Sequence, residues 1–276
     1  MRLSVVIDGR LDAARARQVA TLADRLGLAG VWLRYPWWPL SGTGLSETDC
    51  AGLLAALASG LQVPPGLVVD ADAADPGEPD DAWLDRLIPP AGSRAPGNPR
   101  IALAGSPPMI TQWQGLIERR PGLAVAQLAL PARDGGVSAA AVFVPCAPGR
   151  NLAGEVSAAA SVARGRPVLA EVTVSVGRTA AEARARADAD ELFTLAGHPA
   201  QQGLFGTLEE CQATAARLAH AGATELVCYL PLASDLPDVL AQLRSIAIGA
   251  GVLRPGEPPS AAPPPPAGWG GRRFTA

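Results

Sequence analysis

The chain has 276 residues and a formal net charge of −3, and all 23 of its basic residues are arginine. This mild acidity argues against nucleic acid or an anionic membrane surface as the main partner. No stretch contains the roughly 20 consecutive apolar residues that span a bilayer. The absence of lysine excludes Schiff-base and P-loop lysine chemistry. Two histidines and four cysteines form no HxH, HExxH or CxxC spacing, so we expect no metal site.

Strand and helix patterns alternate along the chain from the first residues onward. The N-terminal strand is too short and too soon polar for a secretory signal, and we therefore expect a cytoplasmic protein. Strands are predicted at residues 3–7, 30–35, 67–69, 101–104, 123–130, 139–144, 167–176 and 225–230. Helices are predicted at residues 13–26, 47–61, 83–87, 109–118, 152–163, 179–195 and 236–248, with a further helix between Thr207 and Gly222.

Eight strands separated mostly by helices predict an α/β fold, a single (β/α)8 TIM barrel. The barrel is expected to be partly degenerate, because some helices are short or missing, especially between the fifth and sixth strands. We assign residues 1–253 to the barrel. Residues 254–276 form a low-complexity tail rich in Pro and Gly, for which the composition predicts an extended or disordered state.

The stretch from Gly206 to Leu230 shows the repeating unit most clearly. Thr207 suits a helix N-cap and Gly222 a helix C-cap, and a nearly continuous apolar strand follows directly. An apolar strand entered from a helix is typical of a parallel sheet covered by helices.

Three motifs in this order resemble the bacterial luciferase-like flavin monooxygenases. They are LADRLGLAGVW at 22–32, VTVSVGRTAAEA at 172–183, and GTLEE at 206–210 with AGATELV at 221–227. The resemblance implies a TIM barrel that uses FMN or coenzyme F420 to reduce or oxygenate a small organic substrate, and it implies a homodimer.

The chain also departs from that family. It is short, and it lacks the G-R-x-x-L-G-(L/V)-G strand of the family's first half. An alternative is therefore a non-catalytic, degenerate barrel without a cofactor, acting as a partner subunit or a small-molecule binder.

Candidate site residues follow from the rule that TIM-barrel active sites lie at the carboxyl ends of the strands. Asp8 and His198 are the catalytic candidates, although a helix-capping aspartate near a turn and a solvated loop histidine are the favoured alternatives. The cofactor-binding candidates are Trp37 and Trp38, Asp70, Gly105 and Ser106, and Arg178. Arg10 and Tyr35 also lie at the ends of strands. Gln127 and Glu171 lie inside strands, and their side chains could point either into the barrel or toward the helices.

These cofactor candidates have distinct chemical reasons. Gly105-Ser106 heads a helix whose N–H groups suit a flavin phosphate, and it resembles the family's G-G-S turn, although Pro107 and Pro108 donate no N–H. The Trp37-Trp38 pair offers flat surfaces for an isoalloxazine ring or an apolar substrate. Arg178 follows the seventh strand, near the usual phosphate region of these barrels. An ordinary turn, a packed loop and a surface arginine are the respective alternatives.

Overall fold

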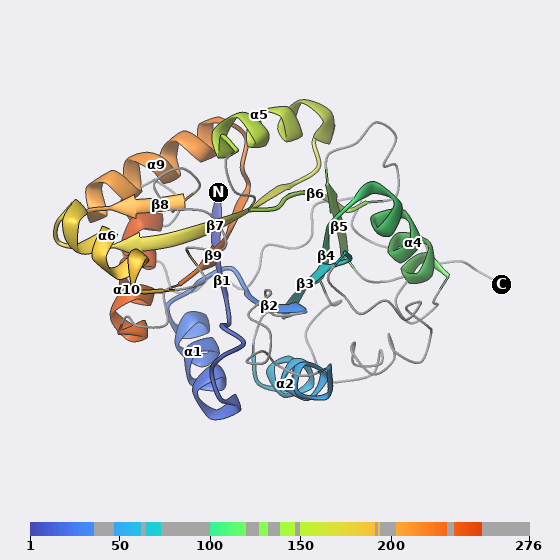
Figure 1. The fold of residues 1–276 in the computed structure, drawn as a ribbon, viewed down its shortest axis with the longest axis horizontal. Helices are drawn as coiled ribbons and strands as arrows, with labels where there is room; N and C mark the ends of the chain where they lie inside the picture. Colours follow the sequence, from blue (N-terminus) through green and yellow to red (C-terminus); the bar gives the residue numbers. More distant parts are fainter. Residues whose placement is uncertain are drawn as a thin grey trace.

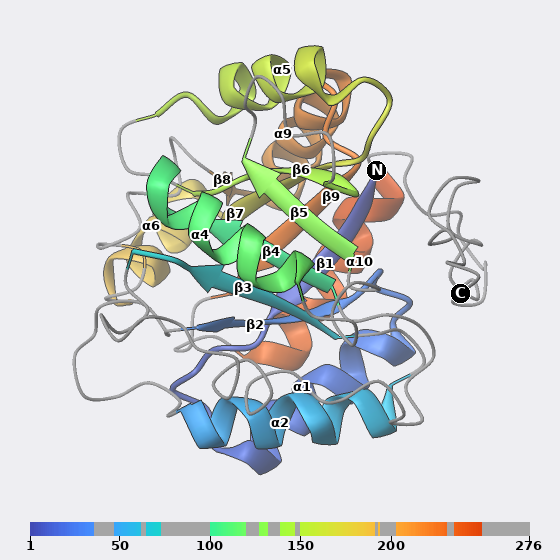
Figure 2. The same cartoon turned by 90° about the vertical axis from the view of Figure 1, so that its right-hand side faces the viewer.

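The computed structural model describes residues 1–35, 47–61, 65–72, 100–119, 127–131, 139–146, 150–190, 193, 203–230 and 235–249. Within them, eight parallel strands close into a barrel: each strand from β1 to β7 pairs with the next, and β9 joins β7 back to β1. The predicted TIM barrel is confirmed. Figure 1 shows the helices around this sheet, with α5 and α9 on one side and α1 and α2 on the opposite side, and Figure 2 shows the same arrangement after a turn of 90°.

The strands have nearly the predicted boundaries. They are β1 (Arg2–Val6), β2 (Val31–Tyr35), β3 (Gly66–Asp70), β4 (Arg100–Ala104), β5 (Gln127–Pro131), β6 (Ala141–Val144), β7 (Val168–Val176), β8 (Gly203–Gly206) and β9 (Glu225–Tyr229). The sequence analysis missed β8. It lies outside the ring and pairs with Thr173–Val176, the end of the unusually long β7.

The helices are α1 (Ala13–Arg25), α2 (Glu47–Gly60), α4 (Pro107–Glu118), α5 (Leu152–Ala163), α6 (Ala180–Asp188), α9 (Leu208–His220) and α10 (Leu236–Gly249). The prediction of one helix over 179–195 was wrong, because α6 ends at Asp188 and Asp190 forms an ion pair with Arg10. The predicted helix at 83–87 and the tail from 254 to 276 lie outside the described residues.

Side-chain caps explain where several helices begin. In α9, Thr207 accepts a hydrogen bond from the Glu210 N–H, and the Glu210 carboxylate accepts one from the Thr207 N–H. This reciprocal capping box satisfies two backbone donors that the helix cannot pair internally. Gly222, with φ of 113°, takes the left-handed turn into β9. The motif at 206–227 therefore encodes a helix start and a helix stop.

The apolar core has two parts. Outward-facing strand residues pack against the helices, and inward-facing residues fill the barrel axis. The inner side chains are mostly small, and the three large rings are those of Trp32, Phe143 and Tyr229. The other inner residues are Val6, Val68, Ala102, Ala104, Ala129, Ala141, Leu169 and Val227. Among the helices of the described residues, none is long and apolar enough to cross a membrane.

Candidate active site at the barrel mouth

Arg34 is the centre of a buried ionic cluster inside the barrel. It comes from the carboxyl half of β2, two residues after the buried Trp32. Residues two apart on a strand point to the same face, so both side chains point toward the barrel axis. Its Nη1 donates to Glu171 Oε1 at 2.8 Å, and its Nη2 donates to Asp70 Oδ2 at 2.9 Å. The Arg34 side chain is only 3% exposed. A charge this deep is stable only when it is paired, and here two carboxylates pair it.

Glu171 holds the opposite side of the cluster. It is fully buried in β7, and its Oε1 also accepts a hydrogen bond from the Tyr229 hydroxyl at 2.7 Å. Its Oε2 accepts one from the Cys146 N–H at 3.0 Å. The Tyr229 hydroxyl in turn accepts a hydrogen bond from Arg34 Nη1 at 3.2 Å. The carboxylate therefore has partners on both oxygens, from three different strands or strand ends.

Burial and neighbouring charges shift the pKa values of Arg34 and Tyr229. Burial alone would lower the pKa of Arg34, but Tyr229, Glu171 and Asp70 outweigh it and raise that pKa. Burial raises the pKa of Tyr229 well above its usual value, and the Glu171 charge adds to this against the opposing effect of Arg34. Arg34 is therefore a permanent cation, and Tyr229 remains a hydrogen-bond donor.

Two further residues set the character of the mouth. The Asp70 side chain is 23% exposed, so it is the part of the ion pair that reaches solvent. Thr173 lies opposite Tyr229 in the β7–β9 ladder, and its buried hydroxyl has no hydrogen-bond partner among the described residues. A buried polar group without a partner is uncommon and calls for an explanation such as a bound water or ligand.

The cluster joins four strands that are distant in the sequence. Arg34, Asp70 and Tyr229 come from the carboxyl-terminal parts of β2, β3 and β9, and Glu171 reaches them from the middle of β7. The carboxyl-end face is the one on which TIM-barrel active sites are built. Of its members, the sequence analysis named Asp70 and left the facing of Glu171 open. It missed Arg34 and Tyr229. The sequence did offer one signal, because Arg34 and Glu171 are the only charged residues in β2 and β7.

A second ionic cluster lies at the opposite, N-terminal end of the barrel. The buried Glu225 accepts hydrogen bonds from Arg100 Nη2 at 2.7 Å and Ser4 Oγ at 2.6 Å, and Arg2 pairs with it at 3.0 Å. The Arg100 guanidinium also stacks 4.4 Å from the Trp32 ring centroid. Active sites of TIM barrels lie at the other, carboxyl-end face, so we regard this cluster as structural.

Asp8 lies in a third group, directly after β1. It accepts hydrogen bonds from the Arg10 backbone and from its guanidinium, with the shortest ion-pair distance at 2.6 Å. Arg10 also pairs with the buried Asp190 at 3.1 Å. Hydrogen bonding to Asp8, more than the opposing burial, raises the pKa of Arg10. Asp8 thus closes a turn and holds an arginine, and its catalytic role stays a prediction.

The turn at Gly105-Ser106 binds the carboxylate of Asp72, a residue of the same chain. The Ser106 N–H donates to Asp72 Oδ2 at 2.6 Å, and its hydroxyl donates to Asp72 Oδ1 at 2.5 Å. The next two residues, Pro107 and Pro108, have no N–H to offer a phosphate. The described residues of this turn therefore do not fit a flavin phosphate while Asp72 is in place.

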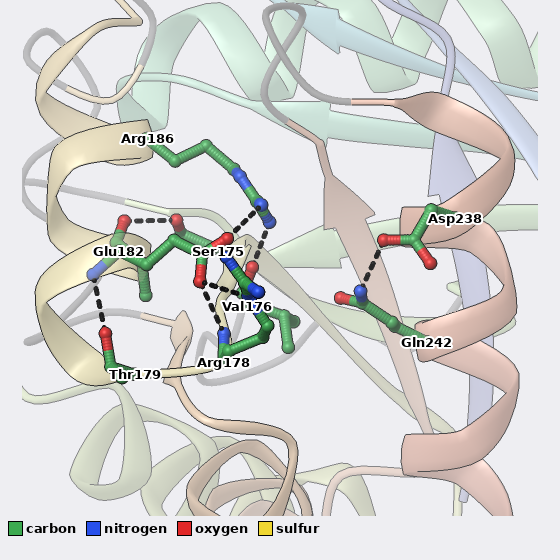
Figure 3. A network of polar contacts seen from close by, with 9 residues as sticks. Ser175, Val176, Arg178, Thr179, Glu182, Arg186, Asp238 and Gln242 are labelled. Atoms are coloured by element: carbon green, nitrogen blue, oxygen red, sulfur yellow. Dashed lines mark hydrogen bonds and ion pairs between the residues drawn. The ribbon is translucent and has the colours of Figure 1, made fainter.

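Arg178 lies at the start of α6, where Figure 3 shows it beside Glu182. Its side chain is 93% exposed, and its Nε donates to Glu182 Oε2 at 3.3 Å. Glu182 also contacts Arg186 and the Thr179 cap. The hydrogen bond from the Arg178 backbone, followed by the one from its side chain, lowers the pKa of Glu182. The contacts of Arg178 are those of a helix-start network, separate from the barrel-mouth cluster.

The remaining predicted residues, Trp37, Trp38 and His198, lie outside the described residues. Among the residues that the structure does describe, no three His, Cys, Asp or Glu side chains could hold a metal ion together.

Comparison with known proteins gives structural matches only. Neither models of protein families nor curated proteins match this sequence. EDTA monooxygenase (EmoA) from Chelativorans sp. BNC1 matches with a TM-score of 0.61 and 12% identity, over 95% of this chain and 96% of that one. An F420-dependent secondary alcohol dehydrogenase in complex with an F420–acetone adduct matches with a TM-score of 0.59 and 10% identity, over 90% and 98%. Riboflavin lyase (RcaE), solved with modified FMN and riboflavin, matches with a TM-score of 0.56 and 13% identity, over 95% and 94%.

The likeness establishes the fold. It covers nearly the whole of each chain, so the barrel is shared from end to end. At these low identities, activity has to be argued from the site itself.

Proposed function

We propose that the chain is a flavin- or deazaflavin-dependent oxidoreductase that acts on a small organic substrate at the mouth of the barrel. The observation that carries the proposal is the Arg34–Glu171–Tyr229–Asp70 cluster, which opens to solvent through Asp70 at the carboxyl end of β3. Fully paired interior charges are costly to maintain, and this cluster lies where TIM barrels perform chemistry. The luciferase-like motifs and the FMN- and F420-containing fold neighbours support the choice of cofactor class.

The described residues suggest how the chain itself would contribute. Asp70 presents a carboxylate at the mouth and would accept a hydrogen bond from an N–H of a bound ring or substrate. Arg34 fixes the position of Asp70, and Glu171 and Tyr229 fix Arg34 from behind. A bound reduced flavin would supply the hydride or, with O2, the oxidising equivalents. The phosphate would need donors other than the occupied Ser106 turn.

A fluorescence titration with FMN and with F420 tests this proposal. We expect one of them to bind at micromolar or lower Kd, and Asp70→Asn to weaken that binding at least tenfold. Glu209→Gln is the matched control, because Glu209 is an exposed acid on α9 and is not a member of the mouth cluster. Failure of both cofactors to bind the folded wild-type protein would refute the proposal.

One observation favours a second function, a non-catalytic barrel that serves as a partner subunit or small-molecule binder. Asp72 fills the anion turn with the chain's own carboxylate, as expected where a phosphate site has been lost. If FMN and F420 fail to bind wild type and also fail to bind Asp72→Ser, the second function becomes the better account. Homodimer formation stays a prediction, and light scattering of the purified protein measures it directly.

A further inference from the structure

A groove of about 500 Å3 lies between α1, with the residues just before it, and the start of α10. It is separate from the ionic cluster of the mouth and is formed entirely by described residues. Its apolar lining residues are Leu11, Val19, Leu22, Leu236, Pro237 and Leu240. Its charged and polar lining residues are Arg10, Asp12, Arg15, Gln18 and Asp235. Its volume falls in the range of specific ligand pockets.

The charges around the groove favour a cationic occupant. Arg10 is already held by Asp8 and Asp190, which neutralise it and leave an excess of one negative charge. Besides Arg10, the charged lining residues are Asp12, Asp235 and a single further cation, Arg15. The Asp235 carboxylate has no ion pair among the described residues. If the two aspartates that pair with Arg10 are included, two arginines and four aspartates belong to the groove and its immediate neighbours.

The residues after α10 have the complementary chemistry. The segment from Trp269 to Phe274, WGGRRF, places two arginines between two aromatic rings. Aromatic and arginine side chains are the anchors most often found at the centre of protein interfaces. The rings would suit the apolar lining residues, and Arg272 and Arg273 would suit the lining aspartates.

The length of the intervening chain also fits. The groove lies at the start of α10, and the helix ends at Gly249, which is about 20 Å further along at 1.5 Å per residue. Residues 250–268 separate Gly249 from Trp269. Even as a polyproline-like segment they span up to about 59 Å at roughly 3.1 Å per residue. The segment can therefore return along α10 to the groove.

We propose that the groove between α1 and α10 binds the chain's own segment 269–274, with Trp269 and Phe274 against its apolar lining residues and Arg272 and Arg273 facing Asp12 and Asp235. The groove borders the Asp8–Arg10–Asp190 group after β1. The docked segment therefore lies beside the carboxyl-end face of the barrel. The inference is independent of the cofactor proposed above.

Disulfide trapping in the full chain tests the docking. Gln18→Cys places a thiol in the lining of the groove, and Thr275→Cys places one beside the segment. Ser161→Cys, exposed on α5, replaces Gln18→Cys in the control pair. The four native cysteines are buried, and burial raises the pKa of Cys50 and Cys211 to about 12, so they react slowly.

We expect the Gln18→Cys pair to form an intrachain disulfide at least tenfold faster than the Ser161→Cys pair, at a rate independent of protein concentration. Reversing the segment's charges with Arg272→Glu and Arg273→Glu should slow the reaction at least fivefold, and adding Asp235→Lys should restore much of it. Equal rates for the two pairs, or no effect of charge reversal, would overturn the proposal. A disulfide that joins two chains at a rate proportional to concentration would also overturn it, because the occupant would then be another copy.

Discussion

Removing the Arg34 cation tests whether the mouth cluster is held by its buried ion pairs. In Arg34→Met the aliphatic length is kept, but Glu171 loses its cation while it remains fully buried. Breaking a buried pair in this way typically costs about 3–5 kcal/mol, since an uncompensated charge stays in the interior. Glu171 keeps hydrogen bonds from Tyr229 and Cys146, and Asp70 reaches solvent. We therefore expect about 3 kcal/mol rather than the upper limit.

The converse change should cost less, and the two changes should not add. Glu171→Met leaves Arg34 paired with Asp70, so we expect a loss of about 2 kcal/mol, within the range for a buried group that loses one partner. The double variant removes both interior charges, and replacing a whole buried pair with apolar side chains is often near neutral. We expect it to lose no more than about 3 kcal/mol, which leaves a coupling of about 2 kcal/mol between the sites.

Urea unfolding followed by circular dichroism measures all three free energies in parallel. If Arg34→Met does not fold, Arg34→Lys retains the cation without the two-pronged geometry and should lose an intermediate amount. A cost below about 1 kcal/mol for Arg34→Met, or single costs that simply add in the double variant, would contradict the argument.

Three other features of the barrel lead to direct tests. Gly66→Ala should lose about 1–3 kcal/mol, because its Cβ would overlap the Trp32 ring, whereas the exposed helical Gly52→Ala, with open space around it, should melt no lower than wild type. Burial would raise the pKa of Glu225, but the charges of Arg100 and Arg2 outweigh it and lower that pKa. The contribution of Glu225 to stability is therefore present above the unfolded-state pKa near 4.5 and should disappear as the pH falls through the lower folded value. Urea midpoints that do not fall from pH 6 to pH 3 would count against this. Thr207→Ala removes half of the capping box of α9 and should cost about 1 kcal/mol, read from the thermal midpoint.

Much of the fold could be predicted from local patterns. The helix predicted at 152–163 has those boundaries in the structure, because Asn151 caps it and its apolar residues recur at helical spacing. The error after residue 188 has a different origin. The sequence continues with alanine and acidic residues that suit a helix, and the break depends on Asp190 reaching Arg10, a contact that spans 180 residues.

The candidate site was less predictable for the same reason. Asp70 could be named because it ends a strand. Arg34 and Glu171 each sit within an apolar run, and 137 residues separate them. The closure of the barrel decides which face of a strand points inward and which side chain becomes its partner. The turn at Ser106 shows the reverse limit, since local sequence suggested an open anion site and the occupying carboxylate comes from Asp72, 34 residues earlier.

The buried charges of the two ionic clusters come from opposite halves of the chain. The interior arginines, Arg34 and Arg100, come from β2 and β4, whereas their fully buried carboxylates, Glu171 and Glu225, come from β7 and β9. A nascent chain that has emerged only as far as β6 would carry these cations without those partners. We therefore expect the N-terminal half to fold stably only when the C-terminal half is present. The two separated halves should associate when they are mixed.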